Sequence, residues 1–222
     1  GENMLTPRYW FAHDFSQFYE YFLTQPHCIK NFRKGELLWK PAQPHGKIHY
    51  IVSGVEMHYA DHESGRRKII SFHGEGTIFP AYSLNDYKIE LSLVTEALTD
   101  MQVLEFTRPQ FKAMFESNSA LREQVINWYS MYVNRFLFET IHQGYNSSLV
   151  KISNMLYLLS SNQAETIAMT QNELAEILGL SRVQLTRGLA ALRERKIITT
   201  QRGRISVIDM PALASLCSSE TL

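Results

Sequence analysis

The stretch TQNELAEILGLSRVQLTRGLAALR, residues 170–193, predicts two short helices joined by a tight turn. Thr170 is followed three positions later by Glu173, and Ser181 is followed in the same way by Gln184. This spacing is that of a capping box, in which the first side chain and the third satisfy backbone N–H groups at a helix start. The two boxes therefore place two helix starts eleven residues apart.

The residues between and after these caps favour a helix-turn-helix. Gly179 can end the first helix in a left-handed conformation, and Ala175 is small where the second helix has to cross the first. Leucines recur at helical spacing and can form one shared core: Leu174, Leu178, Leu185, Leu189 and Leu192. In a helix-turn-helix the second helix enters the major groove of DNA. An ordinary helical hairpin is the alternative.

The outward face of the second helix favours DNA binding over a plain hairpin. Its early, outward side carries Arg182, Val183, Thr186 and Arg187, where a recognition helix presents the side chains that read bases. Arg can pair with both acceptors of guanine, and Val or Thr can contact a thymine methyl.

A basic hairpin is predicted next. Ile197–Thr200 and Ile205–Ile208 are expected as two short strands, with Arg202, Gly203 and Arg204 at the turn between them. The C-terminal part is thus predicted to be a winged helix-turn-helix with a basic wing tip.

The composition is typical of a folded chain, and its excess of basic residues is confined to one segment. At 45% hydrophobic and 20% charged residues, the 222 residues can build cores for one large or two small domains. The formal net charge is zero, but residues 170–208 carry seven basic and three acidic side chains, a net charge of +4. A local basic surface of this kind suits contact with DNA phosphates.

The cysteines and the hydropathy pattern predict a cytoplasmic protein without a membrane partner. Cys28 and Cys217 lie far apart in the sequence. An iron–sulfur cluster usually takes four thiolates, so we expect both to be free thiols in a reducing cytosol. No apolar run approaches the ~20 residues that span a membrane, and no secretory leader is recognised.

Upstream of the helix-turn-helix, the residue pattern predicts three successive kinds of structure. Residues 5–27 are rich in aromatic side chains at spacings of three and four and are predicted to be helical. Short β-type runs broken by turn residues follow and predict a sandwich or roll: Ile48–Val52, Val55–Ala60, Lys68–Phe72, Leu91–Thr95 and Met101–Phe106. A helix with an early proline begins at Thr107.

A long helix with two apolar stripes is predicted from Asn118 to about Gln143. One stripe consists of Leu121, Val125, Trp128, Tyr132 and Phe136, and the other of Ile126, Tyr129, Val133, Leu137 and Ile141. Two stripes imply two packing partners, which we expect to be the β-rich domain and the same helix of a second copy. We assign the first stripe to the dimer seam, with packing against the β-rich domain as its alternative.

The expected fold is therefore α+β in three parts. Residues 1–117 form an N-terminal β-roll, residues 118–144 a long dimerisation helix with a hinge, and residues 145–222 the winged helix-turn-helix.

Order and motifs together resemble the Crp-Fnr superfamily of bacterial regulators, to which the cyclic AMP receptor protein and the fumarate–nitrate regulators belong. The matching segments are Phe32–Glu36, Ile48–Gly54, Gly65 and Gly76 in the roll, and Asn172–Ala175, Gly179–Arg182, Leu185, Arg187 and Leu189 near the C-terminus. The resemblance implies a homodimer held by the long helix, an effector pocket between roll and helix, and double-stranded DNA with an inverted-repeat operator as partner. Contact with RNA polymerase is left open.

The resemblance also implies roles for individual residues. Arg182, Val183 and Arg187 would face base edges beside Thr186. Residues expected to contact phosphates are Gln171, Ser181, Gln184, Arg202 and Arg204. Residues expected to line the effector pocket are Phe79, Tyr82, Leu91, Ser92 and Tyr129.

The chain departs from the nucleotide-binding members of that superfamily at the cassette that holds the nucleotide. Those members carry a second Gly, a Glu for the ribose and an Arg for the phosphate, where this chain has Pro80, Ala81 and Leu91. Pro lacks an N–H, and a buried cyclic phosphate would meet no partner for its charge. We therefore expect an effector of unknown identity other than cyclic AMP or cyclic GMP. The aromatic residues suit an apolar ligand and suit a ligand-free core equally well.

Other functions have weaker signals. Any of His49, His58, His62 and His73 could be an axial haem ligand, but scattered histidines are more often surface or hydrogen-bonded residues, so no cofactor or metal is predicted. A cupin-type metalloenzyme would need a His-x-His start that the sequence lacks, and no catalytic residue is predicted. A dimeric ligand-binding module with a vestigial helix-turn-helix is the remaining alternative.

Overall fold

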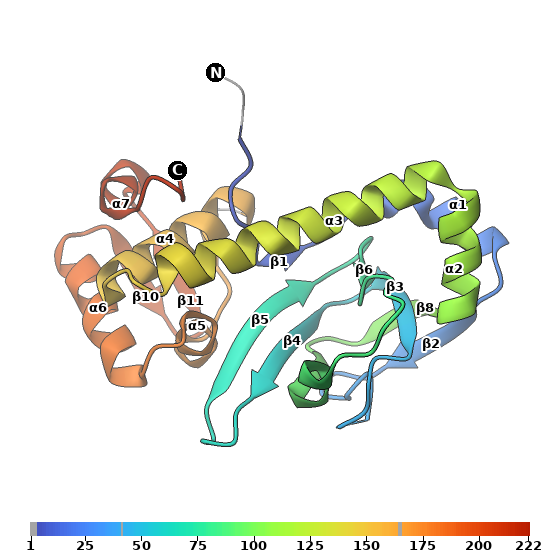
Figure 1. The fold of residues 1–222 in the computed structure, drawn as a ribbon. Coiled ribbons are helices and arrows are strands. Elements are labelled where there is room, and N and C mark those ends of the chain that lie inside the picture. The colour runs from blue at the N-terminus through green and yellow to red at the C-terminus, as the bar shows by residue number, and fades with distance from the viewer. Residues whose placement is uncertain (1–3, 41, 164–165) are drawn as a thin grey trace. The chain divides into compact units, whose positions relative to one another are not determined.

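The computed structural model describes residues 4–40, 42–163 and 166–222 and divides the chain into two compact units. One unit spans Trp10–Tyr132, and the other joins the residues up to Tyr9 to Val133–Leu222. Figure 1 shows strands in the first unit, a long helix, and a cluster of helices with a small sheet in the second. The predicted α+β class, with an N-terminal β-roll, a long helix and a C-terminal winged helix-turn-helix, is confirmed.

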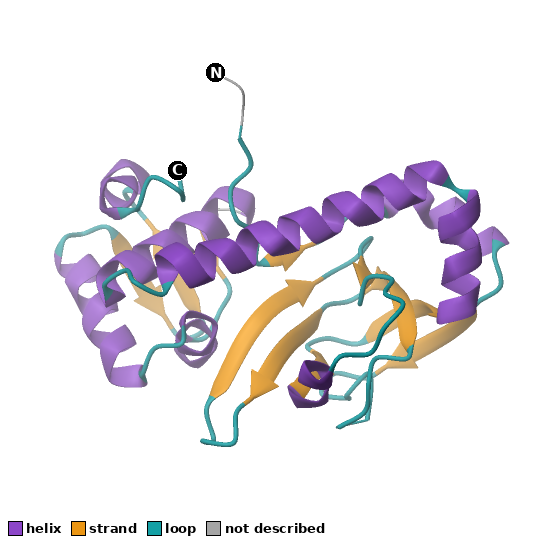
Figure 2. Ribbon diagram, in the orientation of Figure 1, coloured by secondary structure: helices purple, strands orange, loops and turns teal. Residues whose placement is uncertain are grey.

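Two four-stranded sheets form the roll within the described part of Trp10–Tyr132, drawn in orange in Figure 2. Their strand orders are β1-β5-β4-β7 and β2-β8-β3-β6. The strands are β1 (Trp10–Phe11), β2 (Cys28–Phe32), β3 (Lys47–Ser53), β4 (Glu56–Asp61), β5 (Arg67–His73), β6 (Ile78–Phe79), β7 (Leu93–Ala97) and β8 (Met101–Thr107). The β1–β5 pair is parallel, and the other neighbours are antiparallel.

The helix predicted over residues 5–27 is wrong for most of its length. Trp10 and Phe11 instead pair with the end of β5 as strand β1, and only η1 (Ser16–Phe18) and α1 (Tyr19–Thr24) are helical. The spacing of the aromatic residues reflects their burial and not one continuous helix. Four of them lie in a single apolar core: Phe11, Phe15, Phe18 and Phe22. The other helical segments of the roll are η2 (Lys88–Ser92) and α2 (Arg108–Ser117).

The long helix α3 (Ser119–Leu137) continues into a π-helical turn, η3 (Phe138–Gln143). Four residues of the first predicted stripe are buried in the core of their own roll: Leu121, Val125, Trp128 and Tyr132. Trp128 stacks on Tyr132 with ring centroids 4.2 Å apart and contacts the Phe11 ring at 5.8 Å. We expected these four side chains in a dimer seam, and this expectation is wrong. They pack against apolar residues of their own chain.

The opposite face of the long helix is the exposed one. Its exposed apolar side chains are Ile126, Tyr129, Val133, Phe136 and Leu137. Phe136 alone among the first stripe lies on this side. No helix in the described ranges is long and apolar enough to cross a membrane.

The C-terminal unit combines helices with a three-stranded sheet of order β10-β11-β9. Its elements are α4 (Ser148–Gln163), β9 (Thr166–Ile167), α5 (Gln171–Leu178), α6 (Arg182–Glu194), β10 (Ile198–Gln201), β11 (Arg204–Val207) and α7 (Met210–Leu216). The predicted hairpin is confirmed with a shift of one residue in each strand. Strand β9, which pairs with β11, was not predicted, although the alternating buried residues Ile167 and Met169 indicate it.

Candidate nucleic-acid interface

Helix α5 is bounded by the two signals that the sequence predicts. At its start the Thr170 hydroxyl accepts a hydrogen bond from the Glu173 backbone N–H at 3.1 Å. The Glu173 carboxylate accepts from the Thr170 hydroxyl at 3.0 Å, so this cap lacks the return bond to the backbone that a capping box requires. At its end Gly179 is left-handed, with φ of 66°, and Leu180 N–H donates to the Ala175 carbonyl.

Helix α6 begins with the complete capping box. The Ser181 hydroxyl accepts from Gln184 N–H at 3.1 Å, and the Gln184 side-chain oxygen accepts from Ser181 N–H at 2.9 Å. Both side chains thus hold the helix start, which satisfies otherwise unpaired N–H groups. The Gln184 side-chain amide NH2 takes no part in this box.

The predicted shared core of the two helices is confirmed. The five leucines are buried: Leu174, Leu178, Leu185, Leu189 and Leu192. Ala175 is buried with them. This packing fixes which side of α6 faces outward.

The predicted reading face is the exposed side of α6: Arg182, Val183, Thr186 and Arg187 are all exposed. Val183 is an apolar side chain that is 59% exposed. Thr186 donates its hydroxyl to the Arg182 carbonyl one turn earlier, at 2.8 Å. More than half of the apolar Val183 side chain is therefore open to contact with another molecule.

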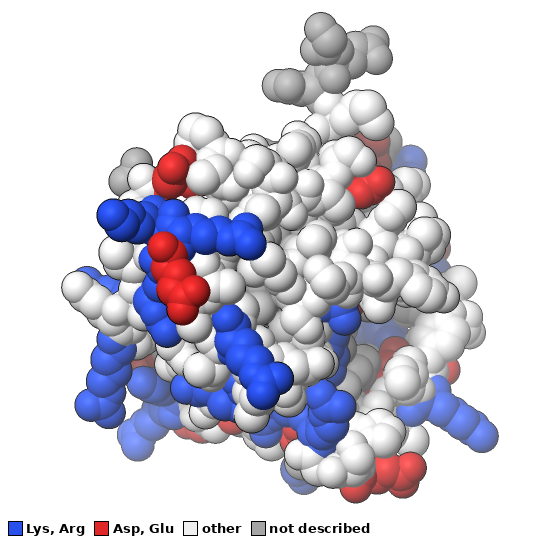
Figure 3. Space-filling view, turned by 90° about the vertical axis from the view of Figure 1, so that its left-hand side faces the viewer, with Lys and Arg blue, Asp and Glu red and all other residues white. Residues whose placement is uncertain are grey.

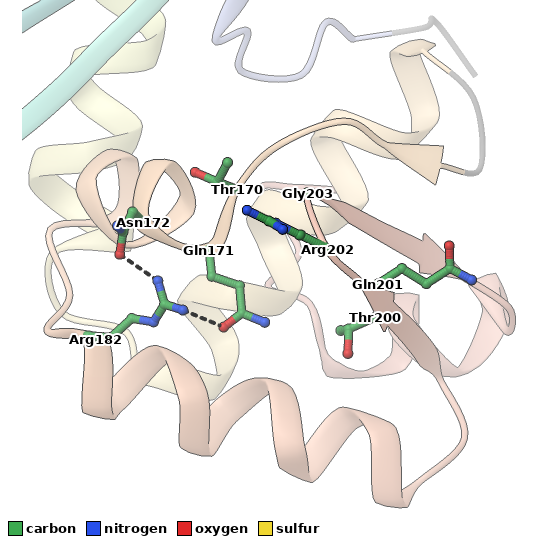
Figure 4. Close-up of a pocket in the computed structure, with 8 residues that line it drawn as sticks. All are labelled: Thr170, Gln171, Asn172, Arg182, Thr200, Gln201, Arg202 and Gly203. Atoms are coloured by element: carbon green, nitrogen blue, oxygen red, sulfur yellow. Dashed lines mark hydrogen bonds between the residues drawn. The ribbon is translucent and has the colours of Figure 1, made fainter.

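Arg182 is tied to the start of α5 (Figure 4). Its guanidinium donates to the side-chain oxygens of Asn172 and Gln171, the latter at 3.1 Å. The side chain is therefore held across the turn in this conformation. Base reading by Arg182 would require these two bonds to break or to be shared.

An open groove of about 500 Å³ lies between the start of α5, the start of α6 and the wing. It is lined by Thr170, Gln171, Asn172, Arg182, Thr200, Gln201, Arg202 and Gly203. In Figure 4 the Arg202 side chain points from the wing toward Thr170 and Gln171. The structure thus brings together Gln171 and Arg202 from the predicted phosphate-contacting residues, whereas Arg204 is exposed outside this lining.

The charge on this side of the molecule is mainly positive. In the view of Figure 3, Lys and Arg side chains gather on the left and lower parts of the face and outnumber the acidic side chains there. An electropositive surface of this kind attracts the phosphate backbone of a duplex.

Of the predicted effector-pocket residues, Tyr82 and Tyr129 are in direct contact. Phe79 is buried against the rings of His58 and His73, with ring centroids 4.6 and 4.3 Å apart. The Tyr129 hydroxyl donates to the Tyr82 carbonyl at 2.9 Å. Leu91 and Ser92 are exposed because their segment forms the 3-10 helix η2 rather than the predicted strand.

The histidines considered as ligands each have a local partner. The exposed His62 hydrogen-bonds to Ser64, and buried His58 to Thr95. Burial lowers the pKa of His49, whose ring donates to Glu105 at 2.9 Å, and this bond lowers the pKa of that carboxyl. No group of three or more His, Cys, Asp or Glu within the described residues is placed to hold a metal ion.

Two family matches cover these two parts of the chain. Residues 29–118 match the cyclic nucleotide-binding domain, and residues 150–216 match the Crp-like helix-turn-helix domain. The chain belongs to the Crp-Fnr family. It is thus a transcription regulator with a DNA-binding helix-turn-helix and an effector-binding type of domain, in a family that is not enzymatic.

Similar Crp-Fnr proteins span nearly the whole chain. The global nitrogen regulator of Synechococcus elongatus is 26% identical over 201 residues, which cover 85% of this chain and 89% of that protein. FixK2 from Bradyrhizobium japonicum has the same fold, with a TM-score of 0.74 at 18% identity over 87% of this chain and 98% of that one. The OCPA complex of CprK matches with a TM-score of 0.73 at 18% identity over 94% and 100%.

Proposed function

We propose that this Crp-Fnr regulator binds an inverted-repeat operator as a homodimer, under the control of an effector that is not a cyclic nucleotide. The exposed face of α6 carries the DNA-binding part of this proposal. Arg182, Val183, Thr186 and Arg187 project there, while the leucines of the same helix are buried. In this assignment they contact base edges in the major groove.

Phosphate contacts would come from both sides of α6. Gln171 and Arg202 line the groove beside it, and Arg204 extends from the exposed wing. Ser181 would contribute through its hydroxyl hydrogen and Gln184 through its side-chain NH2, neither of which the capping box uses. Such contacts fix the position of the protein on the duplex without reading sequence.

The exposed face of α3 supports the homodimer. Ile126, Tyr129, Val133 and Phe136 follow one another at steps of three and four, with Leu137 beside them. This is the spacing of a coiled-coil seam. With the other four residues of the first stripe buried in the roll, this exposed row is the one that a second copy would cover.

The nucleotide cassette supports an effector of another kind. Pro80 and Ala81 replace the Gly and the Glu that the family's nucleotide-binding members use, and exposed Leu91 replaces the Arg. Isothermal titration with cyclic AMP and with cyclic GMP should give no binding heat. A micromolar dissociation constant for either would overturn this part.

The DNA-binding part is tested by selection from random duplexes. We expect an enriched palindrome with half-sites about one helical turn apart, ~34 Å, and with A/T-rich half-sites because Val183 can pack on a thymine methyl. Val183→Glu should move one position per half-site toward G·C, because Glu accepts from cytosine. Ile208→Glu, an equally exposed apolar position outside α6, is the control that should leave the motif unchanged.

The absence of palindromic enrichment would contradict the proposal. An unchanged motif in Val183→Glu would remove Val183 from the residues that read bases.

A further inference from the structure

A carboxylate without a cationic partner of its own lies inside the roll. Glu56 begins strand β4, is fully buried, and lies opposite His73 of β5 and Ala97 of β7. Its Oε1 lies 3.4 Å from His73 Nδ1, but neither carboxylate oxygen has a hydrogen-bond partner among the residues that the structure describes. Glu56 pairs with no Lys or Arg among the residues that the structure describes. A buried charge in such a place is costly unless it is neutralised.

The other nitrogen of the same histidine connects the pair to α3. His73 Nε2 lies within hydrogen-bond distance of the Tyr132 hydroxyl, which is also 2.6 Å from Ser71 Oγ. The rings of His73 and Tyr132 lie nearly parallel, at 8°. A chain of polar contacts thus runs from β4 through β5 to α3, entirely within Trp10–Tyr132.

The elements packed around these polar contacts contribute three histidine or tyrosine side chains and otherwise neutral groups among those that contact the pair in the described structure. β4 and the loop before β3 contribute His58 and His45, with the His58 ring 6.4 Å from His73 and 5.9 Å from His45. β7 contributes the neutral Thr95, which bonds His58. β1 and β6 contribute the apolar rings Phe11 and Phe79, and α3 adds Trp128 beside Tyr132. Among the described residues, the titratable groups that these contacts place near the pair are His58, His45 and Tyr132.

Burial raises the pKa of Glu56 well above its ordinary value. The pair with His73 stays neutral when it holds one proton, either on the carboxyl or on the imidazole. In both forms His73 Nδ1 faces the carboxyl, and Nε2–H can donate to the Tyr132 oxygen while Tyr132 donates to Ser71.

We propose that Glu56 and His73 share one proton at neutral pH, and that this proton anchors α3 to the roll through Tyr132. When the proton leaves to solvent, Glu56 becomes a carboxylate and Nδ1–H must face it, so Nε2 becomes an acceptor. Tyr132 then has to donate to His73 instead of to Ser71. Loss of one proton both leaves a net buried charge and reverses the hydrogen bonds that hold α3.

The pH dependence of stability is set by the number of protons that the pair binds in the folded and in the unfolded chain. In the unfolded chain the two groups titrate near their ordinary values, about 4.3 for Glu and about 6.5 for His. Above pH ~6.5 the unfolded pair is therefore free of protons, while the folded pair still holds one. Folding then takes up a proton, and the unfolding equilibrium constant rises by up to tenfold per pH unit.

The first test compares full-length protein with Glu56→Gln. Urea unfolding from pH 6.5 to 9 should show stability falling with pH in the wild type and a much flatter profile in Glu56→Gln. Glu96→Gln removes the same charge from β7 of the same sheet and should keep the wild-type slope. Parallel profiles for the wild type and Glu56→Gln would overturn the proposal. If Glu56→Gln does not fold, proton uptake on refolding of the wild type gives the same answer, because an uptake well below one proton at pH 8 contradicts it.

The second test concerns the link to α3. Tyr132→Phe removes only the hydroxyl, so the pH slope should remain while amide exchange around residues 128–136 becomes roughly tenfold faster. Ser130→Ala removes a hydroxyl from the exposed face of the same helix that bonds to the Asn127 carbonyl within α3, and it serves as the control. Unchanged exchange in Tyr132→Phe would show that the proton does not anchor the helix.

Discussion

Ile152 of α4 occupies the space beside Gly188 of α6, where a Cβ at position 188 would lie 2.2 Å from Ile152 Cδ1. Ile152 is fully buried, so this methyl group has little room to move. The recognition helix therefore sits as close to α4 as a residue without a side chain allows.

Gly188→Ala is expected to destabilise the C-terminal unit by about 1 kcal/mol, because overpacking outweighs the gain in helix propensity. In an Ile152→Val background, which removes Cδ1, the same substitution should stabilise. Chemical denaturation of the four proteins measures this coupling. Additive effects would show that the close contact does not limit the packing.

Trp128→Ala is expected to lower the free energy of unfolding by ~3–5 kcal/mol, because the ring packs against Phe11 and Tyr132 of its own chain. Under conditions where the variant stays folded, its dimer dissociation constant should be little changed. Ile126→Glu, on the exposed face of the same helix, should weaken the dimer without comparable unfolding. Sedimentation over a range of concentrations separates the two effects, and a dissociated Trp128→Ala beside a dimeric Ile126→Glu would restore the original assignment of the stripes.

Arg204→Gln is expected to weaken binding to all DNA sequences alike, because a wing side chain on a phosphate carries no sequence information. In a dimer the loss of two phosphate contacts should reduce the slope of log affinity against log salt by about 2. Lys112→Gln removes the same charge from α2 and should leave the slope unchanged. Fluorescence anisotropy at several salt concentrations gives both slopes, and equal slopes would exclude a phosphate contact by Arg204.

His45 is expected to make the roll sensitive to acid. Burial, with a smaller contribution from Arg108 and His49, lowers its pKa to about 4. A folded pKa below the unfolded value of about 6.5 means that the stabilisation is complete above pH 6.5 and is lost as the pH falls toward 4. The loss should reach about 3 kcal/mol. His45→Gln should flatten this acid side of the profile, whereas a matching His62→Gln at an exposed turn should not.

The C-terminal half of the fold was predictable because its signals are local. The box of Ser181 and Gln184, the left-handed Gly179 and the buried leucines each need only neighbouring residues to act. The wing followed from two β-type runs around a Gly turn. The same locality made the exposed face of α6 predictable as the candidate DNA-binding surface.

The partners of apolar faces were not predictable in the same way. Periodicity shows that Trp128 and Tyr132 share a face, but only the tertiary structure shows that Phe11 meets it. For the same reason the aromatic spacing near Phe11 was interpreted as one helix. The sequence predicts a strand at Leu91 because η2 has no side-chain cap that would mark a helix start.

The burial of Glu56 and His58 inside the roll was not predictable, because strand β4 is buried on both faces. Alternation along Val55–Ala60 would turn Glu56 and His58 to solvent, yet Met57 and Tyr59 are buried along with them. A pattern that distinguishes inside from outside by polarity cannot reveal a carboxylate enclosed by strands on either side.

The residues that hold helix α6 in place are different from those that it exposes. Ser181, Gln184 and the buried leucines hold α6 in place, whereas Val183, Thr186 and Arg187 are exposed and contribute little to the core. Substitutions at exposed helix positions typically change stability by less than about 0.5 kcal/mol. With the proposed role of that face in reading bases, a duplicated copy of this gene could acquire a new set of target promoters through a few changes there, without compensating changes elsewhere in the domain.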